Sequence, residues 1–306
     1  MKKRILVISV LVIVIVGLIY NFPVSSPTFS EIYQPVDGNI TESLVAFRKS
    51  FPGKQVEIDG NSWKYLVTGS GKETILFLHG MTGAYDIWWQ QILTLKATYR
   101  IVTLTYPPID NLEALSSGII KILEKEDVNI VHLVGSSLGG YLAQYLVAHH
   151  PGKIKSAIFA NTFPPNDIIA EKNRVIGKLL PFIPEWAVMK VLRQNTDNVI
   201  YPAAEYSELV KAFLYEQSFG MMSKDQFVAR FHCVIDPFSP PDTKTLGIPV
   251  MIIEADNDPL VELALREMLK QTYPVAKVKT LKNAGHFPYL SRPQAYTDLI
   301  EDFFQF

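Results

Sequence analysis

The sequence predicts an α/β fold in which helices cover both faces of a mostly parallel sheet, with a helical cap insertion and an N-terminal transmembrane helix. Short apolar runs alternate with helical patterns from about residue 55 onward, and a helical stretch interrupts this alternation at about 161–244. Such alternation is typical of parallel sheets, because each parallel connection needs a crossover helix. With 48% hydrophobic and 19% charged residues in a chain of 306, the composition is that of a globular protein and not of a disordered one.

The N-terminus carries the third observation, an apolar segment behind a basic flank. Three basic residues at positions 2–4 precede sixteen residues without charge at 5–20. As a helix these sixteen residues would span about 24 Å, against about 30 Å of bilayer hydrocarbon, and with the apolar Phe22 and Val24 beyond them the segment just reaches. Pro27 follows the only plausible cleavage site and should obstruct a signal peptidase. We therefore expect residues 1–22 to form a retained signal anchor.

The distribution of basic residues predicts the orientation of this anchor. No Lys or Arg occurs between position 5 and Arg48. By the positive-inside bias, the N-terminus is expected in the cytosol and the rest of this single-pass protein on the extracytoplasmic side of the membrane. Residues 23–54 contain several prolines and are expected to form a stalk, with the main domain at 55–306.

Charge and cysteine content exclude several classes of function. The formal net charge is −1, and the three basic residues at positions 2–4 contribute +3, so the rest of the chain is net acidic. A chain without a basic surplus is not expected to bind nucleic acid. Cys233 is the single cysteine, which excludes an intrachain disulfide and a four-thiolate zinc site.

The main domain begins with a hairpin and continues with buried strands. Apolar residues alternate with polar ones at 56–58 and 63–67, on either side of Asp59-Gly60, which is a hairpin turn signal. Six short apolar runs of the buried-strand type follow, at 74–78, 101–105, 130–134, 157–160, 250–253 and 278–281.

The insertion at about 161–244 consists of helical stretches bounded by prolines. It contains many large apolar residues, among them Phe182, Trp186, Phe213, Phe219 and Phe227. Most of these are expected to pack the insertion against itself. A cap over the strand ends would also bring some of them to the mouth of a pocket.

The chemical signal is Gly135-Ser136-Ser137-Leu138-Gly139-Gly140, which lies between the strand at 130–134 and a helix. A G-x-S-x-G turn from strand to helix holds a nucleophilic serine in a strained backbone, and side chains at the flanking glycines would collide. The positive end of the following helix dipole points at a developing oxyanion. Ser137 is therefore the candidate nucleophile.

A serine hydroxyl needs a histidine base to become nucleophilic. His286 lies just beyond the last predicted strand, in a loop that can reach the C-terminal edge of the sheet, and is the candidate base. The other histidines are better explained by structural roles in turns, helix ends or packing: His79, His132, His149, His150 and His232.

A carboxylate must in turn orient the base. Asp258 follows the strand at 250–253 and is the first candidate, Asp256 is its rival, and Asp167 is a third. The order Ser137, Asp258, His286 is the chain order of a nucleophile-elbow triad, which favours Asp258.

The chain resembles the α/β-hydrolase superfamily over about residues 55–306, from the His79-Gly80 turn through the elbow to the two acid–base loops. The resemblance implies the α/β-hydrolase fold and an oxyanion hole made by the backbone amides of Leu138 and Met81. Within the superfamily the chain is most similar to maspardin-like proteins, in segments 91–95, 106–107, 132–144, 287–290 and 305–306. One departure from many members is Thr105-Tyr106-Pro107-Pro108-Ile109, where an Asp and glycines are common.

Two functions are therefore expected. The first is a membrane-anchored serine hydrolase that attacks an ester-like carbonyl of a small, hydrophobic substrate through Ser137, His286 and Asp258, without a metal or organic cofactor. The alternative is a non-catalytic, maspardin-like binding protein, since maspardin-like members include binding proteins that lack the histidine. The complete Ser, Asp and His set favours catalysis.

Overall fold

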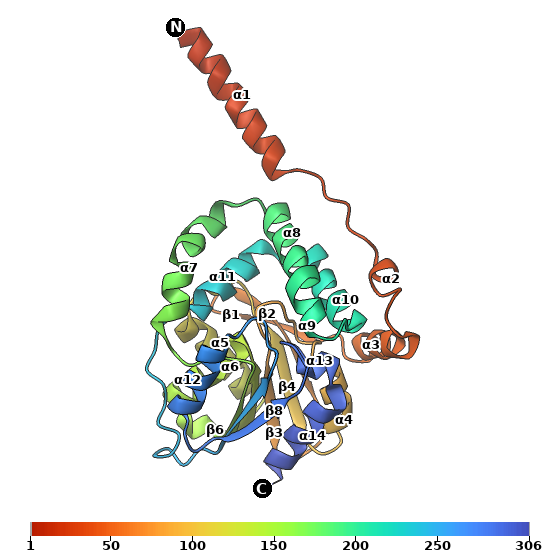
Figure 1. The fold of residues 1–306 in the computed structure, drawn as a ribbon, viewed down its shortest axis with the longest axis vertical. Coiled ribbons are helices and arrows are strands. Elements are labelled where there is room, and N and C mark those ends of the chain that lie inside the picture. Colours follow the sequence, from red (N-terminus) through yellow and green to blue (C-terminus); the bar gives the residue numbers. More distant parts are fainter. Residues whose placement is uncertain (1, 306) are drawn as a thin grey trace.

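An eight-stranded sheet forms the centre of the computed structural model, which describes residues 2–305 (Figure 1). The order across the sheet is β1-β2-β4-β3-β5-β6-β7-β8. The strands are β1 (Lys54–Ile58), β2 (Asn61–Thr68), β3 (Thr74–Leu78), β4 (Arg100–Thr105), β5 (Val131–Ser136), β6 (Ile154–Ala160), β7 (Val250–Ala255) and β8 (Lys277–Leu281). The six strands from β3 to β8 pair in parallel, whereas β1 and β2 are antiparallel, which confirms the mostly parallel sheet.

The helices outside the cap precede β1, connect the strands or follow β8. They are α1 (Lys2–Tyr20), α2 (Phe29–Ile32), α3 (Gly38–Ser50), α4 (Trp89–Leu95), α5 (Leu112–Lys125), α6 (Leu138–His149), the 3₁₀ turn η1 (Pro151–Lys153), α12 (Leu263–Thr272), α13 (Pro288–Ser291) and α14 (Pro293–Phe304). In α5, the Asn111 side chain accepts a hydrogen bond from the Ala114 amide, and apolar residues then recur at helical spacing and are buried.

Two apolar layers form on the two faces of the sheet, because side chains alternate along a strand. Ile75 and Phe77 of β3 belong to the layer that contains α4 and α14. Leu76 and Leu78 belong to the layer that contains α5, α6 and α12. The expected helices on both faces are therefore present.

The segment expected as a cap, about residues 161–244, is helical and lies over one end of the sheet (Figure 1). Its elements are α7 (Asp167–Leu179), the 3₁₀ turn η2 (Leu180–Phe182), α8 (Glu185–Asn195), the π-helical turn η3 (Thr196–Ile200), α9 (Tyr201–Ala203), α10 (Glu208–Glu216), the π-helical turn η4 (Gln217–Met221) and α11 (Lys224–Val234). In α11, Ser223 and Gln226 form a capping box that fixes the start of the helix.

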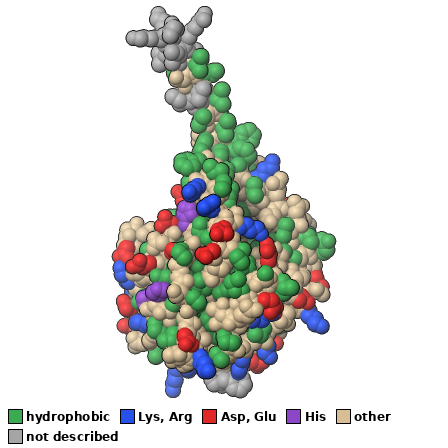
Figure 2. Space-filling view, turned by 60° about the vertical axis from the view of Figure 1, so that its left-hand side comes forward, with side chains coloured by type: hydrophobic (Ala, Val, Ile, Leu, Met, Phe, Trp, Pro, Cys, Tyr) green, Lys and Arg blue, Asp and Glu red, His purple; other side chains and the backbone are tan. Residues whose placement is uncertain are grey.

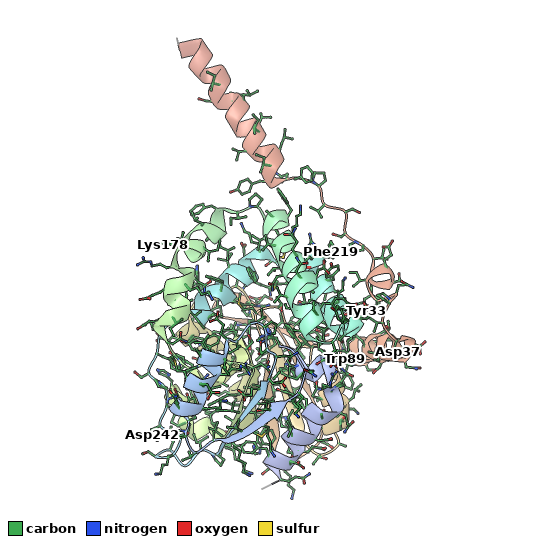
Figure 3. The ribbon with its side chains drawn as sticks, viewed as in Figure 1. Tyr33, Asp37, Trp89, Lys178, Phe219 and Asp242 are labelled. Carbon is green, nitrogen blue, oxygen red and sulfur yellow. The ribbon has the colours of Figure 1, made fainter. Side chains whose placement is uncertain are left out.

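The second half of the segment 23–54, which we expected to be a stalk, is folded onto the domain. Leu44 and Phe47 of α3 are buried in the same apolar layer as α4, and Arg48 donates from Nη1 to Glu216 of the cap at 2.7 Å. Arg48 also donates from Nε to Asp86 at 2.7 Å, and Figure 3 places Tyr33 beside the cap. The prolines that suggested a linker stand before α2 and between α2 and α3, so they bound these helices without interrupting them.

The N-terminal segment, residues 1–22, was expected to cross a membrane. It forms α1 from Lys2 onward, and residue 1 lies outside the described residues (Figure 1). None of the helices in the described part of the chain is long and apolar enough to span a bilayer. At its C-terminal end, the carbonyl of Ile19 accepts a hydrogen bond from Trp186 of the cap at 2.7 Å.

Candidate active site

Ser137 lies at the sharp turn between β5 and α6. Its backbone has φ 56° and ψ −122°, a conformation that a residue with a Cβ adopts only under constraint. The Ser137 amide donates to the Ala160 carbonyl at 2.9 Å, and Thr162 Oγ1 donates to the Ser137 carbonyl at 2.8 Å. The turn is thus fixed from the neighbouring strand.

The two glycines of the elbow are required by close backbone contacts. A Cβ at Gly135 would lie 2.1 Å from the Gly139 carbonyl oxygen, and a Cβ at Gly139 would lie 2.0 Å from the Leu78 carbonyl oxygen. Both distances are far below any van der Waals contact. The sequence pattern predicts glycine at both positions for this steric reason.

His286 lies in the loop after β8 and its side chain is 3% exposed. Its Nδ1 is 2.9 Å from both Oδ1 and Oδ2 of Asp258. Gly285, with φ 65°, makes the turn that brings the imidazole over the C-terminal edge of the sheet. With Nδ1 donating to the carboxylate, Nε2 is left as the proton acceptor.

Asp258 is buried and held by several donors. The amides of Leu260 and Val261 donate to Oδ1 at 2.9 and 3.1 Å, and Asn161 Nδ2 donates to Oδ2 at 2.9 Å. Burial opposes ionisation, but the neighbouring His286 and these hydrogen bonds together hold the pKa of Asp258 below its usual value. The carboxylate is therefore charged at neutral pH.

The two other candidate carboxylates lie elsewhere. Asp256 Oδ1 accepts a hydrogen bond from the Asn283 amide at 2.8 Å and so supports the loop that carries His286. Asp167 stands in the first turn of α7, in the cap. Of the three aspartates considered from the sequence, the structure brings only Asp258 to the imidazole.

Asn161 is a site residue that the sequence analysis missed. It follows β6 in a left-handed conformation with φ 44°, and its amide donates to the Ile253 carbonyl at 2.8 Å. Its side chain donates to Asp258 and, at 3.3 Å, to the Gly285 carbonyl, so it connects the two acid–base loops. An asparagine directly after a buried strand is the signal that could have identified it, because asparagine tolerates this conformation.

The loop after β3 lies beside the elbow. A Cβ at Gly80 would lie 3.1 Å from Ser137 Cβ, so the backbone of this loop approaches the serine closely. Among the described residues, neither the Met81 amide nor the Leu138 amide has a hydrogen-bond acceptor. Leu138 is the first residue of α6, where amides have no intrahelical partner. Both amides are thus free to donate a hydrogen bond beside the elbow.

Ser137 and His286 face the same cavity, which has a volume of about 520 Å³. Its walls come mainly from the cap and are mostly apolar. They include Leu192, Ile200, Leu214, Met222, Phe227, Phe231 and Val234. In the described residues, no hydrogen bond joins Ser137 to His286, a contact that often tightens only when substrate binds.

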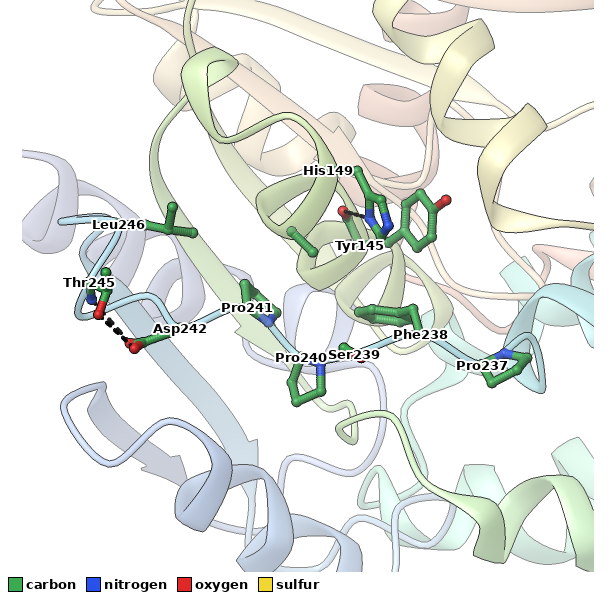
Figure 4. A pocket seen from close by; sticks show the side chains of 11 residues that line it. Tyr145, His149, Pro237, Phe238, Ser239, Pro240, Pro241, Asp242, Thr245 and Leu246 are labelled. Carbon is green, nitrogen blue, oxygen red and sulfur yellow. Dashed lines mark hydrogen bonds between the residues drawn. The ribbon is translucent and has the colours of Figure 1, made fainter.

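Other parts of the molecule offer less chemistry. An open depression beside α6 is lined by Tyr145, His149 and Phe238 and by a run of prolines (Figure 4). His149 Nδ1 is bonded there to the Tyr145 carbonyl at 3.0 Å, and Thr245 Oγ1 donates to Asp242 at 2.6 Å, so these polar side chains are engaged in local hydrogen bonds. Within residues 2–305 no cluster of three or more His, Cys, Asp or Glu side chains is placed to hold a metal ion.

The remaining histidines occupy the structural positions expected for them. His79 and His132 are buried, His149 stacks on Tyr145, His150 is the C-cap of α6, and His232 lies within 3.4 Å of the Gly177 carbonyl.

Comparison with known proteins places this architecture in a family. A model described as "Alpha/beta hydrolase family" matches residues 75–299. Maspardin from Mus musculus is 28% identical over 257 residues, covering 80% of this chain and 81% of maspardin.

Two solved structures illustrate the similarity of fold. A hydrolase from Pseudomonas aeruginosa PA01 has a TM-score of 0.71 at 20% identity, covering 82% of this chain and 98% of its own. A membrane phospholipase A described as a bacterial virulence factor has a TM-score of 0.66 at 19% identity, covering 100% of this chain and 98% of its own. Because the family model spans more than half of the chain, this protein belongs to the alpha/beta hydrolase family and resembles maspardin.

Proposed function

We propose that this protein is a serine hydrolase that cleaves an ester-like bond of a small, hydrophobic substrate. The observation that carries the proposal is that Ser137, on a strained elbow, shares a cavity with His286, whose Nδ1 is 2.9 Å from Asp258. Membership of the hydrolase family and the named hydrolases among its structural neighbours support a hydrolase in general.

The proposed reaction proceeds in two steps. His286 Nε2 accepts the Ser137 hydroxyl proton as Oγ attacks the carbonyl carbon, and the carbonyl π electrons move onto oxygen. The amides of Met81 and Leu138 stabilise this oxyanion. Its collapse breaks the bond to the leaving alcohol, which takes the proton from His286. A water molecule, activated by the same imidazole, then releases the acid and restores Ser137.

The cavity supports a hydrophobic acyl group. Its walls are formed by aliphatic and aromatic side chains of the cap and by Phe287 from the loop that carries His286. Polar groups are few beyond the catalytic residues, among them Asn173, Asn195 and Thr196. An apolar acyl chain would be stabilised there by burial, while the polar ester would lie at Ser137.

The similarity to maspardin suggests an alternative function, that of a non-catalytic binding protein. A module that only binds has no physical need for a serine on a strained elbow together with an oriented histidine. The arrangement of Ser137, His286 and Asp258 therefore favours catalysis.

We also propose that residues 1–22 attach the enzyme to a membrane as a single-pass anchor, with the N-terminus in the cytosol. The basic flank and the uncharged run at 5–20 support this. Hydrophobic side chains extend along the described part of α1 and onto the adjoining cap, where Phe182 is 73% and Val191 is 62% exposed (Figure 2). Membrane fractionation of the full chain and of a chain lacking residues 1–26 tests the anchor, which predicts sedimentation of the full chain only. Protease accessibility of the main domain in intact cells tests the orientation.

The catalytic proposal is tested by labelling the purified full-length chain with a fluorophosphonate probe. We expect the native chain to be labelled, and Ser137→Ala and His286→Ala to lose labelling. Ser136→Ala is the matched control, since Ser136 is the adjacent buried serine and does not line the cavity. A folded native chain that remains unlabelled would exclude the hydrolase and favour the binding protein. If labelling succeeds, a series of p-nitrophenyl esters of increasing acyl length then measures the substrate preference.

A further inference from the structure

A buried arginine of the cap has no part in the reaction described above. Arg230, on α11, is 1% exposed, and among the described residues no carboxylate pairs with it. Burial lowers the pKa of Arg230 only to about 10, so the group remains cationic at neutral pH. An unpaired buried cation is unfavourable, so its hydrogen bonds call for an explanation.

The guanidinium of Arg230 binds backbone carbonyls of two loops at the edge of the sheet. Nη1 donates to the carbonyls of Met81 at 2.7 Å and Gly83 at 3.1 Å, and also lies 3.3 Å from Met222 Sδ. Nη2 donates to the Tyr106 carbonyl at 3.1 Å. The cap thus holds the loop after β3 and the loop after β4 through one side chain.

The hydrogen bonds of Arg230 fix the peptide between Met81 and Thr82, and contacts within the core fix the peptide between Gly80 and Met81. The Gly80 carbonyl is bonded to His79 Nδ1 at 2.6 Å and to the Gly83 amide at 3.1 Å. Because the N–H of a trans peptide points away from its C=O, these contacts direct the Met81 amide away from His79. Arg230 holds the next carbonyl, so both peptides that flank the Met81 Cα are constrained.

We propose that Arg230 is a positioning residue for the oxyanion hole, and that the cap sets the geometry of the hole through it. The inference rests on the proposed function of Ser137 and extends it: the oxyanion hole has its catalytic shape only while α11 is packed in its observed position, with Arg230 bound to the Met81 carbonyl. Arg230 itself does not touch the reacting atoms.

The chemistry of arginine suits this role better than that of any other side chain. A guanidinium is a planar fork of five donors and can bind several carbonyls at fixed angles, whereas a lysine ammonium is a compact point charge on a flexible stem. Gln226, one turn earlier on α11, adds a hydrogen bond from Nε2 to the Tyr106 carbonyl at 2.9 Å. Two residues of the same helix therefore bind the same edge of the sheet.

The same helix carries part of the substrate cavity. Phe227 and Phe231 of α11 line the cavity beside Ser137, on either side of Arg230 in the sequence. An acyl group that fills the cavity packs against α11 and favours its seated position. Occupation of the cavity by substrate is thereby coupled to the formation of the oxyanion hole.

The experiment compares Arg230→Met and Arg230→Lys with the native full-length chain. Loss of an oxyanion-hole donor lowers kcat by about 10²–10³-fold in other hydrolases. We expect a fall in kcat of about 100-fold for Arg230→Met, with KM changed by less than about threefold, because the lost interaction acts in the transition state. Arg230→Lys should retain part of the activity.

Arg193→Met is the matched control, since Arg193 also lies in the cap and donates to a carbonyl, that of Ser218, but does not contact the loop after β3. Its kcat should stay near the native value. Hydrogen exchange of residues 79–88 is measured in the same proteins. Exchange should be faster in Arg230→Met than in the native chain and unchanged in Arg193→Met.

Two results would overturn the proposal. One is an Arg230→Met protein whose kcat per folded molecule is native, even if its thermal stability is lower. The other is unchanged hydrogen exchange at 79–88. If the native chain proves inactive, the proposed function fails, and the exchange experiment still decides whether Arg230 holds the loop. If Arg230→Met does not fold, the same measurements on Arg230→Lys decide.

Discussion

The two backbone segments that meet at the candidate active site are built in opposite ways. The elbow at 135–139 is shaped by its own glycines, by the end of β5 and by the start of α6. The loop at 80–86 is held by His79, which directly precedes it, and by two side chains from other parts of the chain, Arg230 of the cap and Arg48 of α3. The candidate nucleophile is thus positioned by its own turn and by the neighbouring strands of the sheet, whereas the loop after β3 also depends on two elements that surround the core, α11 and α3.

The largest expected effect is the fall in kcat when the carboxylate that orients His286 is removed. In Asp258→Asn, the amide no longer selects the imidazole tautomer that leaves Nε2 free, so we expect kcat to fall by about 10⁴-fold with the fold retained. The rate of ester hydrolysis at saturating substrate measures this fall in kcat. Asp256→Asn is the control, because Asp256 binds the Asn283 amide and does not contact the imidazole. Equal losses in the two variants would contradict the assignment of Asp258.

The elbow is tested by Gly139→Ala. The added Cβ would lie 2.0 Å from the Leu78 carbonyl oxygen, so strand and helix must move apart. We expect a loss of about 3 kcal/mol in the free energy of unfolding and the loss of most fluorophosphonate labelling. Gly152→Ala, where no atom lies within 4 Å of the new Cβ, should change stability by less than about 0.5 kcal/mol. A native-like Gly139→Ala would show that the elbow is not sterically determined.

The contact of α3 with the oxyanion loop and the cap is tested by Arg48→Met. This change leaves Asp86 and Glu216, which are nearly buried, without their cation. The expected loss is about 2–4 kcal/mol in urea unfolding, somewhat less than for a fully buried pair because Arg48 is 20% exposed. Lys121→Met removes an exposed ion pair with Asp59 and should cost less than about 1 kcal/mol. Similar values for both variants would mean that α3 is only loosely attached.

The smallest expected effect concerns acid stability. Burial, followed by the charge of Arg230, holds the pKa of His79 well below 6.5, so the folded protein binds fewer protons than the unfolded chain at low pH. Its contribution to stability is present above about pH 6.5 and is lost as pH falls, by about 1.4 kcal/mol per unit. Between pH 6.5 and 5, His79→Asn should therefore lose less stability than the native chain, by up to about 1.6 kcal/mol. The exposed His149 provides the control, His149→Asn. Parallel pH profiles of native and His79→Asn proteins would contradict the prediction.

Sequence reasoning succeeded where the structure depends on local pattern. The strand at 74–78 was predicted with the boundaries of β3, because a buried strand is a continuous apolar run between turn signals. The elbow was predicted because its steric constraint requires glycines at fixed positions. His286 and Asp258 could be proposed because chain order and strand position are both readable in the sequence.

Contacts between distant segments could not be predicted in this way. The packing of α3 depends on Leu44 and Phe47, whose partners lie in other elements, and composition alone favoured a stalk. Arg230 and Asn161 act through hydrogen bonds to residues more than 90 positions away. Neither a periodicity nor a short motif reports such pairings, so these parts of the site emerged only from the folded structure.

The two π-helical turns of the cap, η3 and η4, have a consequence for how this protein can diversify. Thr196 and Ile200 of η3 and Ser218 of η4 line the cavity. A π-helical turn accommodates one extra residue by widening a helix locally, and such turns are frequent at functional sites. Insertion of single residues into cap helices can therefore reshape the cavity wall while the strands keep their register. The range of ligands that fit the cavity can thus change through the cap while Ser137, His286 and Asp258 stay the same.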